Sequence, residues 1–167
     1  QRFGLYEDLT IRQNLEFVGR LYRLKNLRDV VDASLERLGL ASRQHQLTGA
    51  LSGGWKQRLA LAACVLHQPK LLLLDEPAGG LNHEEVAELG RLIRQIRERG
   101  ITILLVEHDM PMVMEVSDRI VVLNYGRLIA EGPPDRSRSD PSGASVNRPA
   151  SRLATSCGTC ETRATER

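Results

Sequence analysis

The stretch that decides the fold is Leu71-Leu72-Leu73-Leu74-Asp75-Glu76-Pro77, in which four consecutive leucines run into two acidic residues and a proline. A short apolar run that ends in turn residues is typical of a strand buried on both faces. In open α/β sheets, ligands bind beyond the carboxyl ends of the strands. Asp75 could therefore hold Mg²⁺, directly or through its waters, and Glu76 could polarise an attacking water. The alternative interpretation is a plain strand-to-loop transition.

Downstream of this stretch, helical and strand patterns alternate. Asn82 and Glu85 form a capping-box pattern that opens a long amphipathic helix closed by Gly100, and residues 101–106 then predict a second buried strand. A short helix and a hairpin around residues 124–127 complete this zone. Strands that alternate with helices indicate an α/β fold with a mostly parallel sheet flanked by helices on both faces.

Upstream, the first 50 residues predict helices and loops. Thr10 followed by Gln13 is a second capping-box pattern, and apolar residues then recur at helical spacing. A further amphipathic stretch covers residues 27–38, with Gly39 in the position of a helix C-cap. We therefore expect a helical part of the protein before the strands begin.

The segment Leu51-Ser52-Gly53-Gly54-Trp55-Lys56-Gln57-Arg58 joins these two parts. Two glycines allow the backbone to approach a ligand closely, and they precede a helix whose free N–H groups and positive dipole end favour phosphate. Ser52 could cap this helix or donate a hydrogen bond to a phosphate oxygen. The alternative interpretation is an ordinary capped helix start.

His108 follows the second predicted strand. A single histidine near a strand end is most often structural. At the carboxyl end of a parallel strand, however, it would share an edge of the sheet with Asp75 and Glu76. Its imidazole could there form a hydrogen bond to a γ-phosphate or orient a water.

In their order along the chain, Leu-Ser-Gly-Gly, an apolar helix, four leucines with Asp-Glu-Pro, and a strand followed by His108 resemble the ABC ATPase family. The resemblance covers residues 1 to about 132. It implies a P-loop NTPase-like α/β fold, with a mostly parallel sheet that lacks its first strands, and an α-helical subdomain. We expect residues 1–50 to carry the Q-loop and this subdomain, and 51–132 to carry the signature, Walker B, D-loop and H-loop. Residues 133–167, rich in Pro, Ser, Thr and Arg, predict a disordered tail.

The resemblance also implies roles for individual residues, with ATP and Mg²⁺ as the ligands. Asp75 would contact Mg²⁺ as the Walker B aspartate, Glu76 would be the catalytic glutamate that activates water, and His108 would be the switch histidine. Gln1 would be the Q-loop glutamine, which also touches Mg²⁺. The nucleotide-binding residues would be Gln1 of the Q-loop and Leu51, Ser52, Gly53 and Gly54 of the signature. The signature would contact ATP that the partner subunit holds. The D-loop residues at the dimer interface would be Gly80, Leu81 and Asn82.

Two kinds of ABC subunit are similar to different parts of the chain. Residues 1–74 look like multidrug or ABC-2 type exporter subunits, and residues 75–132 look like branched-chain amino-acid importer subunits. The importer type is slightly favoured, because residues 75–132 include Asn82, which stands in place of the usual D-loop aspartate. Either type implies a second ABC ATPase subunit, identical or different, and integral membrane permease subunits. Both place the protein peripherally on the cytoplasmic face of the cell membrane.

Two further hypotheses belong to other classes. One is a truncated, non-catalytic pseudoenzyme that binds a membrane subunit. The other is a soluble ABC ATPase that acts on ribosomes or DNA. The net charge is only +2, and the slight excess of basic residues lies in the tail, so no basic face for nucleic acid is expected.

We predict that the isolated 167-residue chain binds ATP weakly or not at all and does not hydrolyse it. Residues 1–167 contain no G-x-x-x-x-G-K-[ST] sequence, and the amides and lysine of that loop hold the β- and γ-phosphates in P-loop enzymes. Phosphate release from Mg-ATP and binding of a fluorescent ATP analogue would be measured on the purified chain. Hydrolysis above that of a Glu76→Gln control would contradict the prediction.

Overall fold

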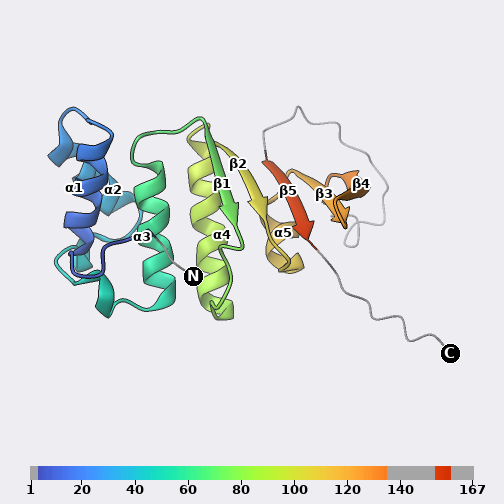
Figure 1. The fold of residues 1–167 in the computed structure, drawn as a ribbon, viewed down its shortest axis with the longest axis horizontal. Coiled ribbons are helices and arrows are strands. Elements are labelled where there is room, and N and C mark those ends of the chain that lie inside the picture. Colours follow the sequence, from blue (N-terminus) through green and yellow to red (C-terminus); the bar gives the residue numbers. More distant parts are fainter. Residues whose placement is uncertain (1–3, 135–152, 159–167) are drawn as a thin grey trace. The chain divides into compact units, whose positions relative to one another are not determined.

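The computed structural model describes residues 4–134 and 153–158 of the chain. The chain divides into two compact units, the first made of residues 1–72 and 80–101 and the second of residues 73–79 and 102–167. Figure 1 shows the course of the chain through the helices and strands of both units. Gln1, expected to be the Q-loop glutamine, lies outside the described residues.

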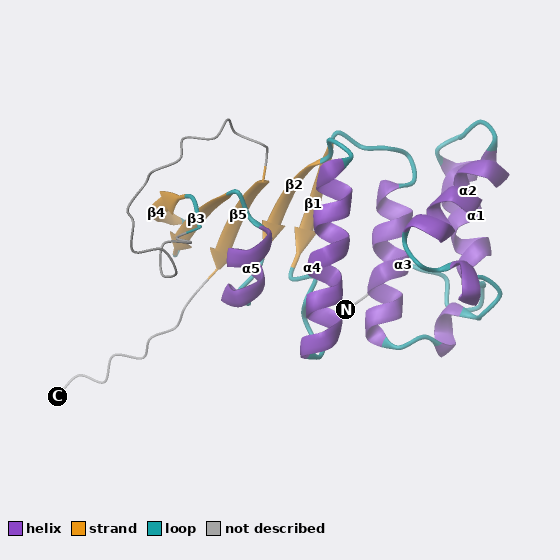
Figure 2. Ribbon diagram, turned by 180° about the vertical axis from the view of Figure 1, so that it is seen from behind, coloured by secondary structure: helices purple, strands orange, loops and turns teal. Residues whose placement is uncertain are grey.

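Apart from the first two residues of strand β1 (Leu71–Asp75), the described part of unit 1 consists of helices and the loops between them. Helix α1 packs on α2 and α3, and α3 packs on α4. These neighbours lie side by side in both of the opposite views in Figures 1 and 2. Its elements are α1 (Ile11–Leu21), α2 (Leu27–Arg37), the 3-10 helices η1 (Ala41–Arg43) and η2 (Thr48–Ala50), α3 (Gly53–Val65) and α4 (His83–Glu98). Fully buried apolar side chains on every long helix form its core, among them Ile11, Leu15, Val31, Leu35, Leu59, Ile93 and Ile96.

Both predicted capping boxes are present. The Thr10 hydroxyl accepts a hydrogen bond from the Gln13 N–H, and the Gln13 side chain accepts one from the Thr10 N–H. Asn82 and Glu85 make the same reciprocal pair at the start of α4. Each box satisfies two donors that the first turn of a helix would otherwise leave free.

A buried amide holds the segment that precedes α1. Asn14 is 2% exposed, and its Nδ2 donates to the Thr48 hydroxyl at 2.9 Å. The Asn14 side chain also exchanges two hydrogen bonds of 2.9 Å with the backbone N–H and carbonyl of Tyr6. Unpaired buried polar groups are costly, so this single side chain fixes both Tyr6 and the turn that contains Thr48.

Unit 2 is built on a five-stranded sheet in the order β1-β2-β5-β3-β4. Strand β5 pairs in parallel with both β2 and β3, and β4 pairs antiparallel with β3. Figure 1 draws the arrows of β1, β2 and β5 in one direction. The elements are β1 (Leu71–Asp75, of which the last three residues belong to unit 2), β2 (Thr102–Val106), α5 (Met110–Val116), β3 (Arg119–Asn124), β4 (Arg127–Gly132) and β5 (Leu153–Gly158). The predicted α/β class with a mostly parallel sheet is confirmed.

The predicted burial of the first strand on both faces is wrong. Burial alternates along β1, with Leu72 and Leu74 buried and Leu71 and Leu73 each 60% exposed. Strand β1 is the first in the sheet order and has one covered face. Four identical leucines hide the two-residue period from which such a strand is normally recognised.

The predicted hairpin is present between β3 and β4. Tyr125 and Gly126 form its two-residue turn, with φ values of 46° and 75°. Positive φ at both central residues is the geometry that matches the twist of two antiparallel strands. Glycine adopts it without strain, and the tyrosine does so as an exposed residue.

The prediction of disorder throughout residues 133–167 does not hold for Leu153–Gly158, which form β5 between β2 and β3. Its sequence, Leu-Ala-Thr-Ser-Cys-Gly, carries almost no apolar pattern. The strand is therefore defined by backbone pairing to neighbours on both sides rather than by a local signal. The predicted disorder of residues 135–152 and 159–167 lies outside the described residues.

Among the residues that the structure describes, none of the helices combines the length and the apolar character needed to cross a membrane.

We predict that Asn14→Ala lowers the free energy of unfolding by about 1–3 kcal/mol, because the buried Thr48 hydroxyl and the partly buried backbone groups of Tyr6 lose their hydrogen bonds. Urea unfolding followed by circular dichroism measures this difference. Gln95→Ala on the exposed side of α4 is the control, and it should stay within about 0.5 kcal/mol of the unchanged protein. An Asn14→Ala variant as stable as this control would contradict the prediction.

Candidate active site

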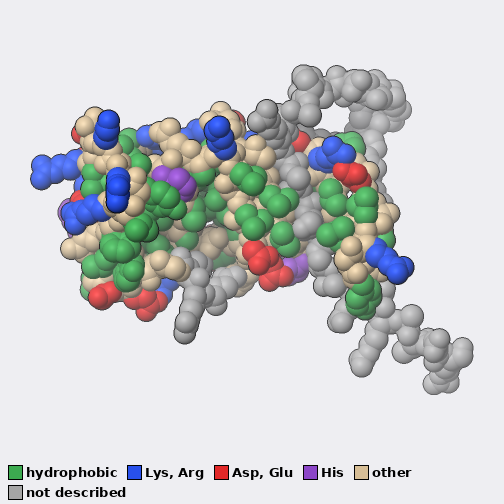
Figure 3. Space-filling model, turned by 45° about the horizontal axis from the view of Figure 1, so that its top comes forward, with side chains coloured by type: hydrophobic (Ala, Val, Ile, Leu, Met, Phe, Trp, Pro, Cys, Tyr) green, Lys and Arg blue, Asp and Glu red, His purple; other side chains and the backbone are tan. Residues whose placement is uncertain are grey.

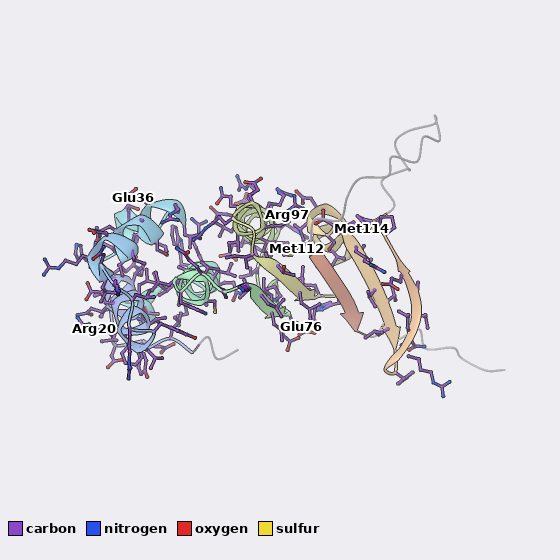
Figure 4. The ribbon with its side chains drawn as sticks, turned by 90° about the horizontal axis from the view of Figure 1, so that it is seen from above. Arg20, Glu36, Glu76, Arg97, Met112 and Met114 are labelled. Carbon is purple, nitrogen blue, oxygen red and sulfur yellow. The ribbon has the colours of Figure 1, made fainter. Side chains whose placement is uncertain are left out.

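Two acidic residues stand where strand β1 ends. Asp75 is the last residue of the strand and its side chain is exposed. Glu76 follows with a φ of 43°, a left-handed conformation that costs a non-glycine residue about 1–3 kcal/mol and recurs at active sites. Its N–H donates to the Val106 carbonyl at 2.8 Å, and its carbonyl accepts from the Gly79 N–H at 3.1 Å. The chain therefore turns sharply at Glu76, which Figure 4 labels at the end of β1.

His108 lies beside Glu76. Its Nδ1 is 3.6 Å from Oε1 of Glu76, and both side chains are about three-fifths exposed, at 63% and 60%. Figure 3 shows acidic side chains gathered on this face with a histidine next to them. The structure thus agrees with the expectation that His108 shares an edge with the residues that end β1. A carboxylate and an imidazole are therefore brought together on an exposed surface.

Glu107 is a residue of this edge that the sequence analysis missed. It is 2% exposed although it is charged, and its two oxygens accept hydrogen bonds from three backbone N–H groups. A signal was present, because Ile103, Leu105 and Glu107 alternate along the chain and strand side chains alternate between faces. Both apolar members are fully buried, so the same period directs the carboxylate inward.

The signature segment belongs to unit 1 and begins helix α3. Leu51 is buried, Ser52 occupies the N-cap position, and the helix starts at Gly53. The Ser52 hydroxyl forms no capping hydrogen bond and its residue is exposed. The structure therefore does not show the helix cap that was one of the two functions expected for Ser52. The first-turn N–H groups lie next to an exposed hydroxyl, and both are donors suited to an anion.

Gly54 makes a close contact with the start of α4. A Cβ at this position would lie 2.5 Å from Oε1 of Glu85. Glu85 is also the capping-box partner of Asn82. Glycine at position 54 therefore lets α3 approach the first turn of α4. Through Glu85, the residue is in contact with the helix start that Asn82 of the predicted D-loop caps.

The residues predicted as the D-loop take part in this same arrangement. Gly80 has a φ of 75°, which favours glycine. Leu81 would lie 3.8 Å from a Cβ on Gly53. The Asn82 side chain is engaged in capping α4. The residues predicted to form the D-loop and the signature therefore pack as neighbours within unit 1.

Charged side chains contact the first turns of α3. The guanidinium carbons of Arg43 and Arg58 each lie 4.6 Å from the centre of a ring of Trp55, at cation–π distance. Lys56 donates a 2.8 Å hydrogen bond to Glu7, and this bond and the lysine's charge hold the pKa of the Glu7 carboxyl below its ordinary value. Lys56 therefore ties α3 to the segment before α1.

A metal could receive one ligand from the described residues of this edge. No group of three or more His, Cys, Asp or Glu side chains that could hold a metal occurs in residues 4–134 and 153–158. Asp75 offers an exposed carboxylate. Mg²⁺ is often bound by one or two carboxylates together with waters and substrate phosphates, so a single aspartate fits such a site.

Known proteins match the chain in sequence. A family model described as ABC transporter matches residues 1–79. The high-affinity branched-chain amino acid transport ATP-binding protein LivG of Escherichia coli K12 is 46% identical over 108 residues, which are 64% of this chain and 42% of LivG. The daunorubicin resistance ATP-binding protein DrrA3 of Streptomyces coeruleorubidus is 37% identical over 149 residues, which are 88% of this chain and 47% of DrrA3.

A solved structure matches as well. CbiO1 from Clostridium perfringens, described as part of the ABC transporter complex cbiONQ, is 32% identical with a TM-score of 0.72. The match covers 81% of this chain and 55% of CbiO1. The chain thus spans about half the length of these relatives. Sequence and fold together place it in the family of ABC transporter ATP-binding proteins.

Proposed function

We propose that the chain forms part of the ATP-hydrolysing subunit of an ABC transporter, which energises the movement of a solute across a membrane. The observation that carries the proposal is the edge at the end of β1, where the exposed Glu76 carboxylate lies 3.6 Å from the His108 imidazole and follows directly on Asp75. The resemblance of the relatives, all named as ATP-binding or ABC transporter proteins, supports it.

Three exposed residues of the edge, Asp75, Glu76 and His108, have a role in this proposal. Bound Mg²⁺ would neutralise charge on the phosphates of ATP, and Asp75 would supply one of its oxygen ligands. Glu76 would accept a hydrogen bond from the attacking water and orient it, because its carboxylate is exposed at the turn. The His108 imidazole would form a hydrogen bond to the γ-phosphate. Gln1 would be a further contact to Mg²⁺.

The signature segment would act on a second subunit. Ser52 and the N–H groups of Gly53 and Gly54 would donate to the γ-phosphate of ATP held by that partner, which is an identical or different ABC ATPase subunit. The exposed Ser52 hydroxyl, which forms no helix cap, supports this role. Gly80, Leu81 and Asn82 would lie at the interface between the two subunits, and Leu51 would anchor the segment from within the core.

Exposed apolar side chains on unit 1 suit a permease subunit. Phe17, Leu21 and Tyr22 of α1 and its C-cap are between 42% and 69% exposed, and Tyr6 packs edge-on against Phe17 at 4.8 Å. Exposed aromatic and apolar groups are typical of a protein interface. The complete protein would then sit peripherally on the cytoplasmic face of the cell membrane, bound to an integral membrane partner.

We predict that Glu76→Gln in the complete polypeptide that contains residues 1–167 lowers ATP turnover by about a hundredfold or more, because a positioned base contributes on the order of 10²–10⁴-fold. ATP binding should persist, since the amide keeps the size of the side chain. Phosphate release and retention of labelled ATP measure the two effects. Glu98→Gln, at an exposed site, is the matched control. Unchanged turnover in Glu76→Gln would contradict the role of Glu76, and absent turnover in the unchanged polypeptide would favour the pseudoenzyme.

The substrate class is proposed to be branched-chain amino acids. The greater identity to LivG than to DrrA3 supports it, and the longer match to DrrA3 keeps a multidrug or ABC-2 type exporter as the second candidate.

We predict that leucine, isoleucine or valine stimulates ATP hydrolysis several-fold when the complete protein is reconstituted in vesicles with its permease and binding subunits. Substrate in that assembly would favour closure of the two ATPase subunits. An amphipathic cationic drug is the comparison and should leave the rate unchanged. Stimulation by the drug alone would favour the exporter instead.

A further inference from the structure

Glu107 is a buried carboxylate for which the proposed chemistry has no use. Its side chain is 1% exposed, so it cannot contact a ligand on the surface. Burying a charged group is costly unless hydrogen bonds compensate for the lost water. The compensation that Glu107 receives involves backbone groups of the two loops that carry the candidate active site.

The first of these loops follows β1. Oε1 of Glu107 accepts a hydrogen bond of 2.7 Å from the N–H of Ala78, which lies two residues after Glu76. The residue before Glu107 contributes as well, since the Val106 carbonyl accepts the N–H of Glu76 at 2.8 Å. The last residue of β2 and the residue that follows it thus hold the turn after β1, the first at Glu76 and the second at Ala78.

The second loop follows β2. Oε2 of Glu107 accepts the N–H of His108 at 2.9 Å and the N–H of Asp109 at 3.3 Å. The same oxygen is 3.7 Å from Nδ1 of His108. The Glu107 carboxylate therefore binds the backbone N–H groups of His108 and Asp109 and also lies near the His108 imidazole.

We propose that Glu107 is a positioning residue, whose carboxylate fixes the distance between Glu76 and His108 by holding the backbone of both loops. Hydrogen bonds to a charged acceptor are roughly twice as strong as neutral ones, so three of them restrain the loops firmly. Small misplacements of reacting groups are costly in rate. The role of this residue in turnover rests on the proposed function above, while its restraint on the two loops does not.

The test replaces Glu107 by glutamine, which has the same shape but turns one acceptor oxygen into a donor. One of the two loops then faces an N–H group and loses its hydrogen bond. In the complete polypeptide, Glu107→Gln should lower kcat for ATP about tenfold or more while KM changes less than about twofold. Glu131→Gln, which removes an exposed carboxylate paired with Arg119 in the same unit, is the control and should leave both unchanged.

A second measurement uses the 167-residue chain without nucleotide. Proton–nitrogen NMR spectra of Glu107→Gln should show shifts at the amides of Ala78, His108 and Asp109 and at the His108 ring, with the helices of unit 1 unchanged. If the complete polypeptide hydrolyses no ATP, the proposed function fails but these shifts still support the restraint. Shifts without any change of kcat, or no shifts, would overturn the proposal.

Glu107→Asp addresses the risk that the glutamine variant does not fold. It keeps the charge with a shorter reach, so its kcat should lie between those of Glu107→Gln and the unchanged protein. A folded Glu107→Asp variant with unaltered kcat and unaltered Ala78 and His108 amides would overturn the proposal. So would unfolding of both variants, because the carboxylate would then be needed for the whole fold rather than for the two loops.

Discussion

The meeting of two neighbouring strand ends is the constraint on which the candidate active site depends. Strands β1 and β2 are adjacent in the sheet, and the N–H of Glu76 still bonds to the Val106 carbonyl as the chain leaves β1. Whatever follows these strands must therefore emerge at one edge. A slip of one residue would turn Glu107 outward and remove its oxygens from the loops. The register of β2 thus sets both the buried carboxylate and the neighbourhood of His108.

Local chemistry in the sequence predicted the local structure well. Thr10 with Gln13 and Asn82 with Glu85 form the expected capping boxes, since each depends on residues three positions apart. The hairpin at Tyr125-Gly126 likewise depends only on its own turn. The faces of β1 could not be predicted, because four leucines carry no alternation. Strand β5 could not be predicted either, because its pairing partners lie far away in the sequence.

The candidate active site was predictable in part. Asp75, Glu76 and His108 were found because polar groups follow apolar strands, and this pattern is visible residue by residue. Glu107 could not be recognised from chemistry alone, because its side chain is buried and does not reach the surface that a ligand could touch. Its burial follows from its position two and four residues after the buried Leu105 and Ile103, because every second side chain of a strand faces the same side. The signal is therefore the alternation of the strand and not the chemistry of the residue. The geometry of an exposed pair can therefore depend on a neighbour that only the folding pattern reveals.

The starts of helices α3 and α4 in unit 1 show that a capping residue can have different functions. At α4, Asn82 and Glu85 satisfy each other, so the first turn has fewer free donors and the loop before it is held in place. At α3, Ser52 occupies the capping position but its side chain forms no capping hydrogen bond, so its hydroxyl is not used to close the helix start. Gly54 lies against the start of α4, because a Cβ at this position would be 2.5 Å from Oε1 of Glu85 in its present position. The capped start of α4 thus supports the start of α3, whose Ser52 side chain forms no cap. An anion that reached Ser52 would meet donors that are already held in position.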